Sequence, residues 1–173
     1  MNENKILQHA SSMASSINCL LENNNHPLQA AMLTYVAIDQ MAWLAIESDR
    51  SCHKDFKKWV NMYVLPKYDL PCNADELWAA RNGLLHMGTA ESGDHKQGKV
   101  DIKIYYTSGS AVCTRNDSGD AIFLAVEHLV QAYLTGVMWF VNELEQDHKR
   151  LQVALDKMQK VLERKDVRPD STA

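Results

Sequence analysis

Apolar residues recur with helical spacing along most of the chain. This spacing predicts four helices in the first half, at about 5–22, 27–48, 52–64 and 74–86. The second is apolar on nearly every side, which is typical of a helix in the middle of a bundle. Pro27 fits its first turn, where a missing N–H costs nothing. Before the fourth helix, Asn73 and Glu76 predict a capping box, and Gly88 is a stop signal after it.

The periodicity changes near residue 100. The segment from Val100 to Tyr106 alternates apolar and polar positions and predicts a half-buried strand. Residues 107–110 predict a turn and 111–114 a short return strand, so we expect one small β-hairpin at about 100–114. From about Asp120 to at least Glu145 the pattern is again helical, and an amphipathic apolar stripe continues to Leu162. The expected fold is mainly α, a bundle of five to six helices with the hairpin inserted, in one domain (1–165) followed by a disordered tail (166–173).

Composition narrows the function classes. The 173 residues suit a single domain, and 46% hydrophobic content is enough for a buried core. Lys and Arg total 18 against 22 Asp and Glu, a net charge of -4. This balance argues against a protein that coats nucleic acid broadly, but it allows a small basic site on an acidic body.

The ends, the cysteines and the apolar stretches favour a cytoplasmic protein. The N-terminus has no basic segment followed by an apolar one, so we expect no secretory signal. The four cysteines form no C-x-x-C pair, which favours reduced thiols over a zinc site or a disulfide framework. Residues 121–141 are long enough to span a bilayer, but Glu127 and His128 would lie in mid-span, so we expect a buried helix and no membrane segment.

The candidate catalytic residues lie at the end of the fourth predicted helix. Arg81 and Asn82 are adjacent there, and His86 follows four positions later. Arg grips phosphate with a planar fork of donors, and His exchanges a proton near neutral pH. Together they are the minimum for metal-free cleavage of RNA, in which the substrate's own 2′-hydroxyl attacks. A separation of five residues corresponds to about 140° around a helix. The two side chains would therefore converge if the last turn unwinds, or if a second copy supplies its own pair.

A carboxylate within the apolar second helix indicates that Arg81 is held in a defined position. Asp39 lies one turn after Tyr35 and one turn before Trp43. A carboxylate on such a helix needs a partner, and Arg81 is a natural one. The alternative is that Asp39 faces solvent beside Gln40. Tyr35 and Asp39 are thus candidate supporting residues of the site.

The pattern Arg81-Asn82-x-x-x-His86, on a helix of a small bundle, resembles the HEPN family. Its members have an Arg and a His separated by four to six residues, often with a polar residue directly after the Arg. The resemblance implies that Arg81 and His86 are catalytic, that Asn82 supports them, and that Asp39 matches the acidic residue some members place on a neighbouring helix. It also implies a homodimer that brings two motifs into one cleft. Two features depart from a simple member of the family. One is the inserted hairpin. The other is the pair of acids Glu91 and Asp94 beside the expected phosphate site, which should weaken RNA binding unless Lys96, Lys99 or Lys103 offset their charge.

Three hypotheses follow. The first is a homodimeric, metal-independent endoribonuclease that cuts single-stranded RNA, a toxin or defence effector with an antitoxin partner and no cofactor. The second is a non-catalytic module of the same fold that binds a nucleotide or a protein partner. The third is a structural bundle in which Arg81 pairs with Asp39 and His86 caps its helix. His95 is a weaker metal candidate. The four tryptophans are expected in the core, although Trp78 beside Arg81 is also suited to stack a base.

Overall fold

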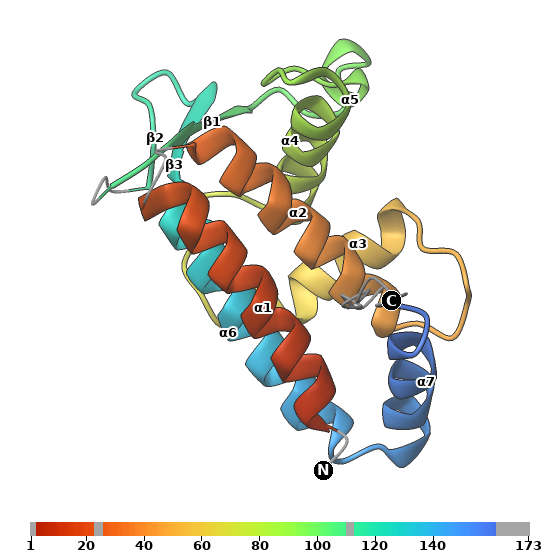
Figure 1. The fold of residues 1–173 in the computed structure, drawn as a ribbon. Coiled ribbons are helices and arrows are strands. Elements are labelled where there is room, and N and C mark those ends of the chain that lie inside the picture. The colour runs from red at the N-terminus through yellow and green to blue at the C-terminus, as the bar shows by residue number, and fades with distance from the viewer. Residues whose placement is uncertain (1–2, 23–25, 110–112, 162–173) are drawn as a thin grey trace, which may run out of the picture.

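The computed structural model describes residues 3–22, 26–109 and 113–161 and is mainly helical (Figure 1). In chain order its elements are α1 (Glu3–Glu22), α2 (Pro27–Leu44), α3 (His53–Trp59), the π-helical segment η1 (Val60–Val64), α4 (Ala74–Met87), α5 (Gly93–Lys96), β1 (Lys103–Thr107), β2 (Thr114–Arg115), β3 (Ala121–Ala125), α6 (Val126–Leu144) and α7 (His148–Met158). The mainly α prediction is confirmed. The predicted tail lies outside the described residues.

Helix α2 occupies the middle of the bundle, as its apolar surface predicts. It packs against α1, α3, α4, α6, α7 and β1, and Figure 1 shows α1, α2 and α6 running side by side as the long layer of the molecule. Large side chains from three of these elements fill the core, with Tyr35, Trp59, Tyr133 and Phe140 at most 1% exposed. Contacts with six other elements hold α2 in place, so its side chains start from a fixed backbone.

The prediction that α2 reaches Ser48 is wrong, because the helix ends at Leu44. The ammonium of Lys157 on α7 donates to the carbonyl oxygens of Trp43, Ile46 and Ser48 at 2.7, 2.6 and 2.8 Å. A cation at a helix C-terminus satisfies carbonyls that the helix itself leaves free. The same contact fixes the segment 45–51, which leads into α3.

The prediction of a hairpin between residues 100–106 and 111–114 is also wrong. The sheet order is β1-β3-β2, with β1 parallel and β2 antiparallel to β3. Thr114 belongs to β2 and pairs with Phe123, while residues 111 and 112 lie outside the described part. The hairpin that forms joins β2 to β3, and its turn is closed by Asp120, which accepts hydrogen bonds from Ser118 and Asn116.

Strand β3 was expected to be the first turn of the long helix. Four of its five residues are buried, all but Phe123, because β3 lies between β1 and β2 in the sheet and against the core. A short strand buried in this way is a continuous apolar run, which periodicity does not distinguish from a buried helix. Helix α6 therefore begins at Val126. It ends at Leu144, and Asp147 caps the separate helix α7 through the backbone N–H groups of Lys149 and Arg150.

Candidate functional site

Helix α4 is fixed at both ends, which gives its side chains a defined position. The predicted capping box is confirmed, because Asn73 Oδ1 accepts from the Glu76 N–H at 2.9 Å and Glu76 Oε2 from the Asn73 N–H at 2.8 Å. Glu76 also accepts two hydrogen bonds from Arg115 of β2. Gly88 ends the helix in the left-handed conformation at φ 64°, which glycine adopts without strain.

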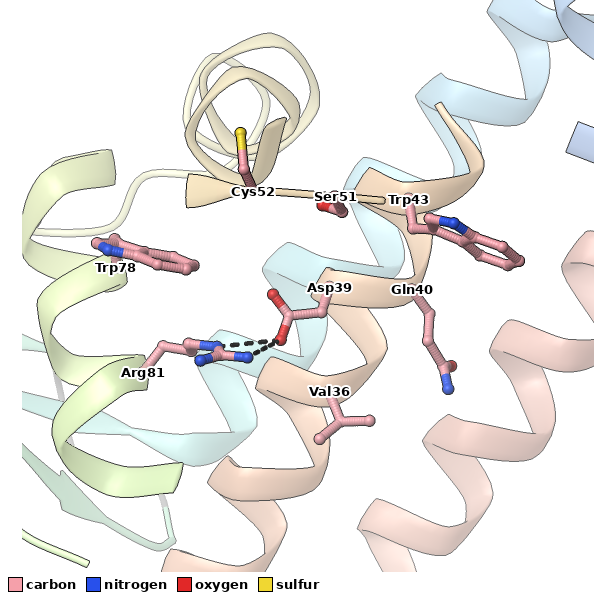
Figure 2. Close-up of a pocket in the computed structure, with 8 residues that line it drawn as sticks. All are labelled: Val36, Asp39, Gln40, Trp43, Ser51, Cys52, Trp78 and Arg81. Atoms are coloured by element: carbon pink, nitrogen blue, oxygen red, sulfur yellow. Dashed lines mark hydrogen bonds and ion pairs between the residues drawn. The ribbon is translucent and has the colours of Figure 1, made fainter. Parts of the chain in front are cut away.

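The predicted ion pair between α4 and α2 is confirmed. Arg81 donates from Nε and Nη2 to Asp39 Oδ2 at 3.0 and 2.7 Å (Figure 2). The side chains are 18% and 29% exposed, so Asp39 does not lie on a free polar strip. Burial raises the pKa of the Asp39 carboxyl, and the Arg81 hydrogen bonds and charge offset this only in part. A partly buried ion pair is by itself weak evidence for stability, whereas its geometry fixes the orientation of the guanidinium.

The other edge of the guanidinium meets the rest of the motif. Arg81 Nη1 donates to Asn82 Oδ1 at 3.0 Å and lies 3.2 Å from His86 Nε2. A guanidinium has no acceptor, so Nε2 accepts this hydrogen bond, which assigns the imidazole as neutral with its proton on Nδ1. His86 is exposed while Arg81 and Asn82 are half-buried, so the motif reaches the surface at its histidine.

Neither of the two expected routes to convergence is needed to bring Arg81 and His86 together. Helix α4 remains α-helical through Met87, and both side chains belong to one copy. The separation of about 140° describes the directions in which the side chains leave the helix. The Arg81 side chain is long enough to reach from its own position to the imidazole, and Asp39 holds it in that orientation.

Tyr35 is not part of this group. It is fully buried, and its hydroxyl accepts a hydrogen bond from Tyr106 of β1 at 2.8 Å. The two rings are perpendicular, with centroids 6.2 Å apart. Burial raises the pKa of both hydroxyls. Within the described residues Tyr35 therefore joins α2 to the sheet and makes no hydrogen bond to Arg81 or Asp39.

The segment after α4 folds back onto the motif helix at Gly83. A Cβ at this position would lie 2.6 Å from the Thr89 carbonyl oxygen and 3.0 Å from that of Glu91. Real Cβ atoms do not approach backbone oxygens so closely, so the contact requires glycine. Glycine within the motif thus lets the 89–91 segment cover one side of α4.

Glu91 and Asp94 each face a lysine, as expected for two of the three candidate lysines. Lys103 lies 3.8 Å from Glu91, and Lys99 lies 3.7 Å from Asp94. Both pairs include well-exposed groups and are weak. They nevertheless offset the negative charge beside the motif.

His95, the weaker metal candidate, has both ring nitrogens engaged. Nδ1 accepts from the Ser92 N–H at 3.1 Å, and Nε2 lies 2.9 Å from the Ile102 carbonyl oxygen. Across residues 3–22, 26–109 and 113–161, no group of three or more His, Cys, Asp and Glu side chains is placed to hold a metal ion. His95 is therefore a structural link between α5 and the approach to β1.

A cavity of about 330 Å³ lies against the Arg81–Asp39 pair, and the sequence did not indicate it. It is lined by Val36, Asp39, Gln40, Trp43, Ser51, Cys52, Trp78 and Arg81 (Figure 2). The Trp78 ring lies over the guanidinium, 5.1 Å from its carbon. On α2 the spacing of Val36, Gln40 and Trp43 already places these residues on one face. Their exposure to a cavity depends on segment 45–51, which no local pattern predicts.

Comparisons with protein-family models, curated proteins and solved structures find no match for this chain. The HEPN resemblance therefore rests on the Arg81, Asn82 and His86 motif and on the helical architecture. Among the described helices, none has the length and apolar character needed to cross a membrane.

Proposed function

We propose that this protein is a metal-independent endoribonuclease of the HEPN type that cuts single-stranded RNA and acts as a toxin or defence effector. One observation carries the proposal. The Arg81 guanidinium is oriented by Asp39 along one edge and contacts Asn82 and the exposed His86 along the other. A phosphate-binding group and a proton acceptor are thus adjacent at the surface.

The chemistry that fits this arrangement is attack by the 2′-hydroxyl of the RNA. When the phosphate takes the place of His86 on Arg81 Nη1, the lone pair of His86 Nε2 becomes free, and it removes the 2′-hydroxyl proton as the 2′-oxygen bonds to phosphorus. Arg81 donates hydrogen bonds to the phosphate oxygens, where negative charge accumulates. The bond to the 5′-oxygen breaks, and that oxygen takes up a proton. The products are a 2′,3′-cyclic phosphate and a 5′-hydroxyl.

A second copy belongs to the proposal for an electrostatic reason. Asp39 neutralises the charge of Arg81 within one copy, and all three guanidinium nitrogens already have partners. A phosphate must displace Asn82 or His86 from Nη1 or use the remaining N–H of Nη2. Two motifs facing one phosphate supply two guanidinium groups, and the second His86, as an imidazolium released from its own Arg81, gives its Nε2 proton to the leaving oxygen. We therefore propose a homodimer, whose activity an antitoxin protein would restrain.

A non-catalytic module that binds a nucleotide or a protein partner is the second candidate, and the cavity beside Arg81 favours it. The two functions separate in a cleavage assay with chelator present. The enzyme cuts single-stranded RNA, leaves DNA of the same sequence intact because DNA lacks the nucleophile, and produces cyclic phosphate ends. RNA that remains intact, or DNA that is cut as fast as RNA, contradicts the ribonuclease and leaves the binding module.

A further inference from the structure

The cavity against Arg81 has the dimensions of a small-ligand site. Its volume of about 330 Å³ is at the lower end of the roughly 300–1,000 Å³ of ligand pockets. The Arg81 guanidinium is part of its lining, so a group held on the phosphate-binding residue is directly beside the cavity. The volume suits one base or nucleoside better than a longer chain.

Two of the eight residues that line the cavity are tryptophans, and both are held by contacts. Trp78 of α4 packs on Phe56, with ring centroids 5.3 Å apart, and lies over Arg81. On the other side, Trp43 of α2 donates from Nε1 to the Asp49 carbonyl oxygen at 3.1 Å, and the Lys157 ammonium lies 4.9 Å from its ring. Figure 2 shows the two indoles on opposite sides of the cavity. Fixed aromatic walls favour a flat, apolar-faced ligand that loses little entropy on binding.

Among the polar groups that line the cavity, Asp39 presents a carboxylate oxygen that selects the edge of such a ligand. Both Arg81 contacts end on Asp39 Oδ2, and Figure 2 shows the other carboxylate oxygen directed into the cavity. Burial raises the pKa of this carboxyl, and the Arg81 contact offsets the desolvation only in part. A carboxylate oxygen only accepts hydrogen bonds, so it favours a ligand that brings N–H groups and repels one that brings a carbonyl oxygen.

We propose that the cavity is a nucleobase subsite that prefers guanine. The Watson–Crick edge of guanine carries two adjacent N–H donors, and both can share the free carboxylate oxygen of Asp39, which accepts more than one hydrogen bond. Adenine and cytosine offer one amino group beside a ring acceptor. Uracil offers one N–H between two carbonyl oxygens and is disfavoured most. The inference rests on the proposed function in one respect only, since it places the phosphate of the bound nucleotide on Arg81.

Calorimetric titration of the full chain with guanosine, adenosine, cytidine and uridine 3′-monophosphates tests the subsite. These nucleotides contain no phosphodiester bond to cut, so binding is measured without turnover. We expect the guanosine nucleotide to bind at least tenfold more tightly than the uridine nucleotide. Equal affinity for the four, or no binding of any, overturns the proposal.

Two variants assign the binding to the cavity. Ser51 is exposed at the rim, and Ser51→Trp fills the opening without removing a core residue, so it should abolish guanosine nucleotide binding. Trp78→Leu removes one wall and should weaken binding by about 5–150-fold, the range for loss of one base-stacking contact. Trp139→Ala is the matched control, because Trp139 lies on α6 outside the cavity and is 46% exposed. Unchanged affinity in Ser51→Trp contradicts the assignment.

RNA cleavage by the same proteins separates this inference from the ribonuclease proposal. If RNA is cut but neither guanine nor Ser51→Trp affects the rate, the subsite fails and the ribonuclease stands. If RNA stays intact while the guanosine nucleotide binds and Ser51→Trp blocks it, the ribonuclease fails and the subsite stands.

Discussion

The Asp39–Arg81 pair orients a functional group at little net gain in stability, and a double-mutant cycle tests this. The perturbations are Asp39→Ala, Arg81→Ala and the two combined. Arg81→Ala leaves a carboxylate that is 29% exposed with no cation to balance it. Asp39→Ala leaves a guanidinium that still contacts Asn82 and His86. The double variant leaves neither charge.

The magnitude follows from the burial of the pair. Removing one partner of a fully buried pair costs about 3–5 kcal/mol, and an exposed pair is worth about 0–1 kcal/mol. With 18% and 29% exposure, we expect Arg81→Ala to cost about 2–3 kcal/mol and Asp39→Ala about 1–2 kcal/mol. Because the pKa of Asp39 is raised despite the pairing, the double variant should cost no more than Arg81→Ala alone, which gives a coupling of about 1–2 kcal/mol.

Urea unfolding followed by circular dichroism measures all four proteins. A carboxyl with a raised pKa is protonated more readily in the folded than in the unfolded state, so its ionisation lowers stability as pH rises. The deficit of Arg81→Ala should therefore be smaller near pH 4 than at pH 7. Glu47–Lys149, in which both side chains are more than 70% exposed, is the control pair and should show almost no coupling. Additivity within about 0.5 kcal/mol for Asp39 and Arg81 would refute the reasoning.

Three further predictions concern stability. Gly83→Ala should lower the free energy of unfolding in urea by about 1–3 kcal/mol, because the new Cβ meets the Thr89 carbonyl oxygen. A gain of ~1 kcal/mol, which the helix propensity of Ala alone would give, would contradict the contact. Lys157→Met should cost about 2–4 kcal/mol by the same assay, since three carbonyl oxygens lose their donor; a loss below 1 kcal/mol would show that the ammonium is dispensable. Burial raises the pKa of Cys72 from 9.0 to about 12. The free energy of unfolding should therefore fall between these pH values by up to about 1.4 kcal/mol per pH unit. Cys72→Ala should reduce that slope, and an unchanged slope would exclude the thiol as its source.

Sequence patterns predicted the parts of the structure that depend on contacts between residues close together in the chain. The start and end of α4 follow from Asn73, Glu76 and Gly88, because capping contacts involve residues only a few positions apart. The Asp39–Arg81 pair joins distant positions, but it was predictable because a carboxylate on a buried helix requires a cation.

The sheet was not predictable in the same way. The partner of β1 is β3, which lies after β2 in the chain, so no turn connects the paired strands. The apolar run Ala121–Ala125 adjoins α6 directly and has no period that separates it from the helix. Only the packing of distant segments decides that it is a strand.

The cavity depends on contacts between three distant segments. Trp78 on α4 and Trp43 on α2 were both expected in the core, where aromatic residues usually lie. Segment 45–51 brings Ser51 between them, and the Lys157 contacts from α7 hold that segment. No window of the sequence contains this information, so only the Asp39, Arg81 and His86 side of the site was predicted.

The central claim is that Arg81 and His86 form a catalytic pair, and the most direct measurement is the single-turnover rate of cleavage of single-stranded RNA with chelator present. General acid–base catalysis contributes about 10²–10⁴-fold, so His86→Ala should lower the rate at least 100-fold. Arg81→Ala should do the same while circular dichroism shows a folded protein, and His148→Ala, an exposed histidine on α7, should cleave like the unaltered chain. Cleavage that persists in His86→Ala or Arg81→Ala at the rate of the unaltered chain would contradict the claim.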